Sequence, residues 1–135
     1  PESGYFAMKD ILAEGNPPSA LFIASDVVAS GAYKAILEAN LCIPEDISIV
    51  GFDDIPSAAW FHPPLTTLRL PAFDIARNAG SILINLITST PGEEKILLPA
   101  ELIERRSTIQ FNAEREEGNK GKNKKSVLNQ NFLKE

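Results

Sequence analysis

Hydrophobic residues are distributed along the chain in two patterns, one typical of strands and one of helices. The run 47–54, Ile-Ser-Ile-Val-Gly-Phe-Asp-Asp, is rich in β-branched and aromatic residues and is largely apolar at both alternating sets of positions. This pattern is typical of a strand that is covered on both faces inside an α/β sheet. Residues 20–24 and 65–70 are shorter apolar runs. We therefore predict three strands.

Helical spacing of apolar residues predicts three helices. The first covers residues 4–14, with Ser3 as its N-cap. The second begins with Ser25 or Asp26 as its cap, and the third covers residues 71–88 with a wide apolar face. Because the second helix joins two predicted strands, the three elements form a βαβ unit, and its strands should be parallel with a right-handed crossover.

The carboxyl-terminal part of the chain is less regular. Residues 95–98 and 102–109 are predicted to be extended. From residue 112 onward Asn, Lys, Glu and Gly dominate, and few residues could pack in a core. We therefore predict a folded part over residues 1–111 and a polar, disordered tail over residues 112–135.

Composition limits the class of protein. With 135 residues and 44% hydrophobic content, the chain can bury one modest core. Residues 1–111 hold 14 acidic and 7 basic side chains, so the folded part is ill suited to bind a nucleic-acid backbone. No apolar run has the length of a membrane span, and no signal-peptide pattern is present. The single cysteine, Cys42, allows no internal disulfide and fits a reducing, cytoplasmic location.

Two adjacent carboxylates follow the central apolar run, and the first of them, Asp53, is the main candidate for a binding residue. Ligands of parallel α/β sheets bind just beyond the carboxyl ends of strands, where loops present polar groups. A solvated loop acid is the alternative that spacing alone leaves open. Asp53 and Asp54 are neighbours and should point to opposite faces of the strand, which makes them a poor acid–base pair. Asp26 is either a plain helix cap or a supporting residue of the same site.

Catalytic and metal chemistry lack the residues that they need. His62 is the only histidine and lies in an aromatic loop, residues 56–64, where a surface or packing role is expected. One histidine and one cysteine, twenty residues apart, are not a metal-ligand set. Gly51 stands alone, so the chain has no glycine-rich phosphate loop. We therefore predict no enzyme activity, no cofactor and no metal site.

Five segments, in order and with consistent spacing, resemble one protein family. They are Pro-Glu-Ser-Gly-Tyr at 1–5, Ala-Ser-Asp at 24–26, Ile-Pro-Glu-Asp-Ile-Ser-Ile-Val-Gly-Phe-Asp-Asp at 43–54, Pro-Pro-Leu-Thr-Thr at 63–67 and Pro-Ala-Glu-Leu-Ile-Glu-Arg-Arg-Ser-Thr at 99–108. The family is that of the lac, galactose and purine repressors (LacI/GalR), bacterial regulators with a periplasmic-binding-protein-like fold. Each segment alone is weak evidence, but five in series are highly specific.

The resemblance implies an α/β domain of type I, in which two doubly wound parallel subdomains are joined by three crossover strands and close over a small effector. The chain resembles only its carboxyl-terminal portion. Residues 1–62 resemble the second subdomain, 65–90 the strand and helix that return to the first, and 95–109 the crossover and final strand. The first half, and the helix-turn-helix headpiece that binds operator DNA, are not in this chain. We therefore expect the apolar faces of strand 65–70 and helix 75–87 to lack partners.

The resemblance also implies roles for individual residues. Asp53 matches the aspartate that accepts hydrogen bonds from the effector, and a carboxylate suits this role because it offers several acceptor sites. Ser25 matches a site-lining position that is often Asn in sugar-responsive relatives, and Asp26 follows it. A homodimer is expected through the second subdomain, with these residues at its surface: Tyr5, Ser30, Tyr33, Lys34, Ser57, Ala59, Trp60 and Phe61. Ordinary core packing is the alternative for Trp60 and Phe61.

The expected function is therefore effector sensing and dimerisation in a bacterial DNA-binding transcriptional regulator. Its partners would be a small molecule, such as a sugar, and a second copy of the chain, with no membrane contact. A periplasmic sugar-binding protein of a transporter is the alternative, because it shares the fold. The sequence Leu-Ile-Glu-Arg-Arg-Ser at 102–107 resembles the repressors more closely and favours the regulator.

Overall fold

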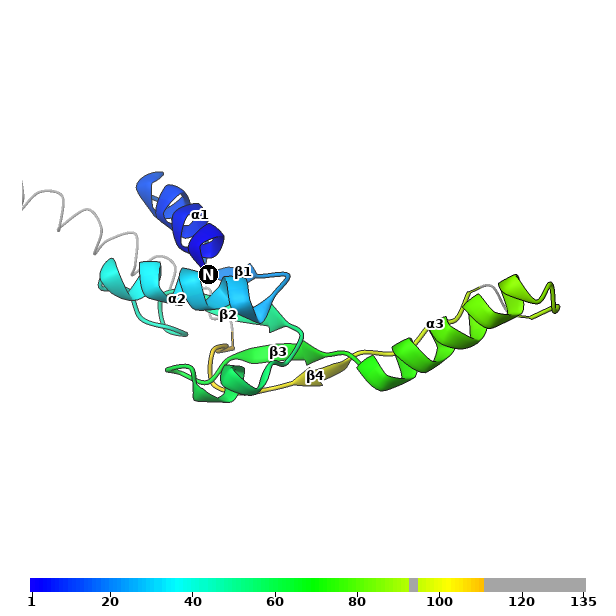
Figure 1. Cartoon of the computed structure of the whole chain (residues 1–135). Coiled ribbons are helices and arrows are strands. Elements are labelled where there is room, and N and C mark those ends of the chain that lie inside the picture. Colours follow the sequence, from blue (N-terminus) through cyan, green and yellow to red (C-terminus); the bar gives the residue numbers. More distant parts are fainter. Residues whose placement is uncertain (93–94, 111–135) are drawn as a thin grey trace, which may run out of the picture.

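The computed structural model describes residues 1–92 and 95–110. Its central element is a four-stranded sheet (Figure 1). The strand order is β1-β2-β3-β4, in which β1, β2 and β3 are parallel and β4 is antiparallel to β3. In chain order the elements are α1 (Glu2–Ala13), β1 (Ala20–Phe22), α2 (Asp26–Glu38), β2 (Ser48–Phe52), the 3-10 helix η1 (Pro56–Trp60), β3 (Thr66–Arg69), α3 (Ala72–Ile87) and β4 (Glu101–Ile103). The predicted tail, residues 112–135, lies outside the described residues.

The predicted parallel βαβ unit is confirmed as β1, α2 and β2. Ile49 and Gly51 are buried on one face of β2, whereas Ser48, Val50 and Phe52 on the other face are only half-buried. For the described part of the chain, the prediction of a strand covered on both faces is therefore wrong. The reason is that α2 packs on one side of the sheet and α1 packs on α2 (Figure 1).

Several element boundaries differ from the prediction. Pro1 is the N-cap of α1, so Ser3, the predicted cap, lies inside the helix. The loop 56–64 contains the short helix η1. Of the predicted extended segments 95–98 and 102–109, only the part in β4 is a strand among the described residues, because its residues alone pair with β3 in a regular antiparallel ladder.

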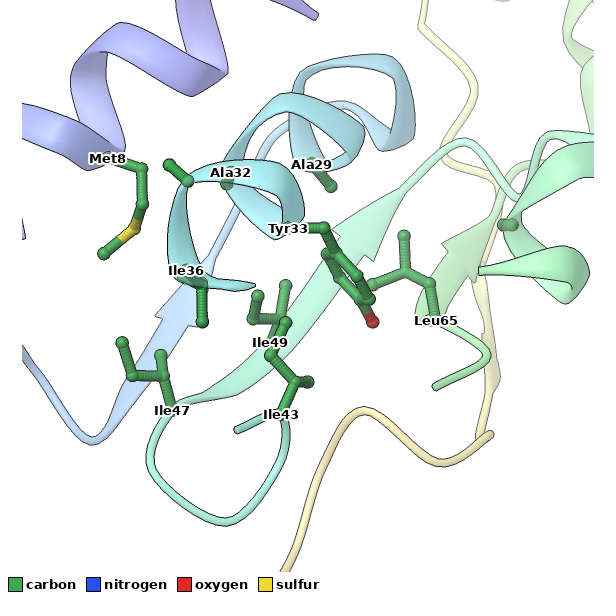
Figure 2. Packing of buried hydrophobic residues seen from close by; sticks show 11 residues of the cluster. Met8, Ala29, Ala32, Tyr33, Ile36, Ile43, Ile47, Ile49 and Leu65 are labelled. Carbon is green, nitrogen blue, oxygen red and sulfur yellow. The ribbon is translucent and has the colours of Figure 1, made fainter. Parts of the chain in front are cut away.

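The hydrophobic core lies where α1, α2 and the sheet meet (Figure 2). Its buried members are Met8, Ala29, Ala32, Tyr33, Ala35, Ile36, Ile43, Ile47, Ile49, Ala58 and Leu65. Two glycines allow α1 to approach α2 closely. A Cβ atom added to Gly31 would overlap the carbonyl oxygen of Pro1, and one added to Gly4 would overlap that of Val28. The backbones of the two helices therefore touch at these glycines.

Helix α3 extends away from the sheet (Figure 1), and the described part of the chain buries none of its residues. Its exposed apolar side chains include Phe73, Leu86 and Ile87. Within the described residues, nothing covers the apolar face of this helix. The expectation that apolar residues lack partners is wrong for Leu65 of the predicted strand 65–70, which is fully buried, whereas Leu68 and Leu70 are half-buried. None of the described helices, α3 included, is long and apolar enough to span a membrane.

Candidate functional site

The turn after β2 holds Asp53, the main candidate, in an uncommon backbone conformation. Asp53 and Asp54 have φ angles of 111° and 52°. Residues other than glycine rarely adopt such positive values, which cost about 1–3 kcal/mol each and persist only where surrounding contacts hold them. Because the backbone leaves the strand at this point, the prediction that the two side chains alternate across a strand does not apply.

Contacts to three consecutive residues hold this turn in place. The N–H of Asp53 donates to the carbonyl oxygen of Leu68 in β3 at 2.9 Å. Asp54 binds two arginines through its carboxylate, and the N–H of Ile55 donates to Oδ2 of Asp26 at 3.0 Å. The side chain of Asp53 is exposed and accepts no hydrogen bond from the described residues. The backbone of Asp53 is therefore fixed, while its carboxylate is available to a ligand.

Asp54 anchors the end of β2 to two other parts of the sheet. Its side chain is 6% exposed. Oδ1 accepts a hydrogen bond from Nη2 of Arg105 at 2.6 Å, and Oδ2 is 2.7 Å from both Nε and Nη2 of Arg69. Arg105 also donates through Nη1 to the carbonyl oxygen of Leu65 at 2.7 Å, and Arg69 lies 3.3 Å from Glu101. One carboxylate thus joins β2 to β3 and to the segment after β4.

The charge state of Asp54 follows from these neighbours. Burial by itself would raise the pKa of the carboxyl group. The hydrogen bonds and positive charges of Arg105 and Arg69 together outweigh burial and hold this pKa below its usual value of 3.8. The carboxylate is therefore ionised, and its bonds to the arginines are charge-assisted.

Asp54→Asn should lower the free energy of unfolding at pH 7 by about 1.5–3 kcal/mol, because charge-assisted bonds are lost at a buried group. Since the pKa is lower in the folded state, the unfolded state takes up protons first as the pH falls. The stabilisation is complete above about pH 5 and is lost as the pH falls below the usual carboxyl pKa. The difference between the unsubstituted chain and the variant should therefore shrink from pH 5 to pH 3.

Urea unfolding of both proteins across this pH range measures the difference. Asp74→Asn is a matched control, because its carboxylate pairs with Arg77 at 2.9 Å but both side chains are largely exposed. This control should change the free energy of unfolding by less than about 1 kcal/mol. An Asp54→Asn deficit that is the same at pH 3 and pH 7 would contradict the assignment of the shifted pKa to Asp54.

Asp26 lies beneath the turn and is fully buried. Its Oδ1 accepts a hydrogen bond from Oγ1 of Thr67 at 2.7 Å, and its Oδ2 accepts one from the N–H of Ile55. The N-cap of α2 is Ser25, whose side chain makes no capping hydrogen bond. A Cβ atom added to Gly51 would overlap Oδ1 of Asp26, so only glycine leaves room for this carboxylate. Of the two roles considered for Asp26, the contacts match the supporting one.

Ser25 and Asp53 come to the same edge of the sheet. Strands β1 and β2 are parallel, so their carboxyl ends lie side by side, and Ser25 and Asp53 follow these two ends. Ser25 is half-buried. This edge is the place where ligands of parallel sheets bind. The structure therefore brings together the predicted binding residues, with Asp26 below them.

A second feature is a hollow of about 550 Å³ against the outer side of α2. Its lining residues are Ser30, Tyr33, Lys34, Leu37, Glu38, Phe61 and His62. The rings of Tyr33 and Phe61 pack edge to face, with centroids 5.1 Å apart, and the hydroxyl group of Tyr33 donates to the carbonyl oxygen of Pro63 at 3.1 Å. Burial raises the pKa of Tyr33 to about 12, so its hydroxyl group stays protonated at neutral pH. Four of the predicted dimer residues thus line one hollow.

Of the other predicted dimer residues, Tyr5 contacts two residues that line this hollow. The hydroxyl group of Tyr5 donates to Oε2 of Glu38 at 2.6 Å, and Nζ of Lys34 lies 5.2 Å from the centroid of the Tyr5 ring. Trp60 directly precedes Phe61 and is 86% exposed, so core packing, the alternative considered for it, is wrong. Phe61 is half-buried against Tyr33. Ser57 and Ala59 are exposed.

Comparison with known sequences finds one family over most of the chain. Residues 2–108 match the periplasmic binding protein-like domain family. The HTH-type transcriptional repressors PurR of Erwinia tasmaniensis and of Pectobacterium atrosepticum are each 42% identical over 108 residues, which is 79% of this chain and 32% of the relative. The chain therefore spans about a third of the length of these curated relatives.

Solved structures match the same region. A lac repressor dimer bound to operator and the anti-inducer ONPF is similar with a TM-score of 0.74 and 33% identity, over 80% of this chain and 38% of that one. A LacI family transcriptional regulator from Enterococcus faecium with bound ribose has a TM-score of 0.69 and 30% identity, over 82% of this chain and 41% of that one.

A mostly parallel sheet, in a chain whose residues 2–108 match the family, defines a periplasmic-binding-protein-like domain. The predicted fold class is therefore confirmed. Within this class, the chain belongs to the LacI/GalR family of transcriptional regulators and forms part of their effector-binding domain.

Arg69 and Arg105 are neighbours of the site that the sequence analysis did not single out. They are far apart in the chain and meet at Asp54 only because β3 and β4 pair. The available signal was indirect. Asp54 is a second carboxylate at the end of the predicted strand, and the sequence assigned no role to it. A buried carboxylate needs a cationic partner, so its position could have prompted a search for arginines.

Proposed function

We propose that this chain is the effector-sensing and dimerising part of a DNA-binding transcriptional regulator. A small molecule bound at Asp53 modulates operator binding by a separate helix-turn-helix part. The supporting observation is an exposed carboxylate on a firmly held turn at the carboxyl end of a parallel strand. Such a carboxylate accepts hydrogen bonds from hydroxyl and N–H groups of a ligand. The relative from Enterococcus faecium is solved with ribose, which supports a polar effector.

The relatives support a regulator over a periplasmic solute-binding protein. The PurR relatives are transcriptional repressors, and the lac repressor structure contains operator. The acidic composition of residues 1–111 fits a part that does not itself contact DNA. A cytoplasmic location follows from this function.

The division of the chain into parts is also a proposal. Residues 1–62 are assigned to the second subdomain, 65–90 to the return toward the first, and 95–109 to the crossover and final strand. The exposed apolar face of α3 supports this division, because an amphipathic helix of a globular protein packs this face against another element. The first subdomain is that element in this proposal.

A hybrid repressor tests the effector site. Residues 2–108 of this chain replace the matching segment of PurR from Pectobacterium atrosepticum, which is 42% identical. Thermal unfolding is then followed with free sugars, D-ribose among them, and with purine bases. A compound that binds the folded hybrid should raise its Tm in a concentration-dependent way. If no compound shifts the Tm or changes operator binding, the proposed sensing function is wrong for these ligand classes.

Asp53→Ala in the hybrid should weaken binding of the compound identified in this way by about tenfold to a hundredfold, because hydrogen bonds to a charged acceptor are lost. Asp10→Ala is the control, since Asp10 is an exposed carboxylate on α1, away from the sheet edge. Calorimetric titration measures both affinities. Equal affinities in the two variants would remove Asp53 from the site.

Phe61→Asp in the hybrid should shift the repressor from dimer toward monomer. Phe61 lines the hollow on α2 and follows the exposed Trp60, and a two-fold contact there would bring each substitution into the interface twice. An unpaired charge in such a desolvated patch weakens association by at least about tenfold. Sedimentation velocity at micromolar concentration measures the change. Ala13→Asp, at an exposed position of α1, is the control, and an unchanged dimer in both variants would exclude this surface.

A further inference from the structure

The carboxylate of Asp54 contacts the end of the sheet from which the chain leads into α3. Residues 70–92, which include α3, and residues 95–100 form an arm that leaves the sheet after Arg69 and returns to it at Glu101 (Figure 1). Arg69 is the last residue of β3, Glu101 is the first of β4, and Arg105 follows β4. Asp54 binds both arginines, and Arg69 also contacts Glu101. The turn after β2 is therefore connected directly to the base of the arm.

We propose that Asp54 is a positioning residue that sets the backbone of Asp53 and couples it to the base of the arm. The inference rests on the proposed function only in taking Asp53 as the residue that contacts the effector. It assigns to Asp54 no contact with a ligand, because its carboxylate is buried and already shared between two arginines.

The backbone geometry explains why such a holding contact is needed. At a φ angle of 111°, Asp53 lies outside the conformations that its own backbone favours. Its N–H bonds to Leu68, the residue before Arg69, so the same stretch of β3 holds both Asp53 and Asp54. Hydrogen bonds weaken steeply as distance and angle depart from the optimum. A shift of the arm's base therefore changes the contacts that keep Asp53 in place.

Hydrogen exchange at the backbone amide of Asp53 tests the inference without any ligand. In the full 135-residue chain, Asp54→Asn should accelerate this exchange about tenfold to a hundredfold, because charge-assisted bonds hold the turn. The internal reference is the backbone amide of Ile23, which follows β1. Its N–H donates to the carbonyl oxygen of Val50 in β2 at 2.8 Å, on the edge of β2 that faces β1. Exchange at this amide should change by no more than about twofold. Mass spectrometry with peptide fragmentation resolves both amides at low micromolar concentration.

Coupling to the arm is tested through the arginines. Arg69→Gln and Arg105→Gln should each accelerate exchange at Asp53, and combining either with Asp54→Asn should add little, because the residues act through one contact. Arg77→Gln is the control, since Arg77 pairs with Asp74 on α3 itself. If Asp54→Asn does not fold, as judged by circular dichroism, Arg69→Gln carries the test, because Arg69 is half-exposed and its loss leaves the bond to Arg105 in place.

Two results would overturn the inference. Equal acceleration at Asp53 and Ile23 would mean that Asp54 stabilises the whole sheet and does not position Asp53. Unchanged exchange at Asp53 would mean that its backbone is held by other contacts. Failure of the proposed function is seen separately, as unchanged ligand affinity of the hybrid with Asp53→Ala.

Discussion

Gly31→Ala should lower the free energy of unfolding by about 3 kcal/mol, the upper end of the usual range for overpacking. Helix propensity alone predicts the opposite, a gain of about 1 kcal/mol. The added Cβ atom would overlap the carbonyl oxygen of Pro1 and lie 2.7 Å from the backbone nitrogen of Tyr5. These are backbone atoms of α1 and its N-cap, and they cannot rotate away. The start of α1 must move, and the packing of Met8, which is 2% exposed, is lost with it.

Gly80→Ala provides the matched control, because Gly80 is also inside a helix, but a Cβ atom there would meet no atom of another described element within 4 Å. It should leave stability unchanged or raise it by up to about 1 kcal/mol. Urea unfolding followed by circular dichroism compares the three proteins. If Gly31→Ala is as stable as Gly80→Ala, the two helices do not touch at this glycine.

The unsubstituted 135-residue chain should self-associate at micromolar concentration through α3. Large apolar side chains of this helix are widely exposed, among them Phe73 at 78%, Ile84 at 63% and Ile87 at 74%. Contiguous apolar patches of this kind drive association in water. Sedimentation velocity should show assemblies larger than a dimer, and their amount should increase with concentration.

Leu83→Glu combined with Ile87→Lys should disperse these assemblies, because the pair interrupts the apolar face and adds a favourable i,i+4 ion pair on the helix. The control is Ser3→Glu with Ala7→Lys, which places the same charges at the same spacing on exposed positions of α1. Only the α3 variant should reduce the protein to a dimer or monomer. A single monomeric species in the unsubstituted chain would show that α3 is not a site of association.

The helices and strands were largely predictable because their signals are local. Apolar spacing along α3 and the β-branched run in β2 identify these elements without knowledge of their neighbours. The ends were less predictable. Ile47, Asp53 and Asp54 belong to the predicted run 47–54 but not to β2, which is limited by its pairing with β1 and β3. Ser3 has the side chain of a cap, yet α1 begins before it.

The candidate binding site was predictable in part. Asp53 follows a parallel strand, and position alone made it a candidate before its environment was known. The different environments of Asp53, Asp54 and Asp26 became visible only in the structure. Asp53 and Asp54 are adjacent and of the same residue type. The carboxylate of Asp54 is buried between two arginines, whereas that of Asp53 is exposed. Asp26 likewise has a buried carboxylate bonded to Thr67 and Ile55.

By itself, the sequence determined the order and type of the main elements, the parallel βαβ unit and, through five motifs in series, the family. These properties depend on neighbouring residues or on the repeated spacing of residue types. Only the tertiary structure decided that Arg69 and Arg105 share the carboxylate of Asp54, and that α1 and α2 touch at Gly4 and Gly31. Such contacts join residues far apart in the chain, and they form because strand pairing and helix packing bring specific atoms within a few ångströms. The spacing of residue types along the chain does not indicate which distant residues come into such contact.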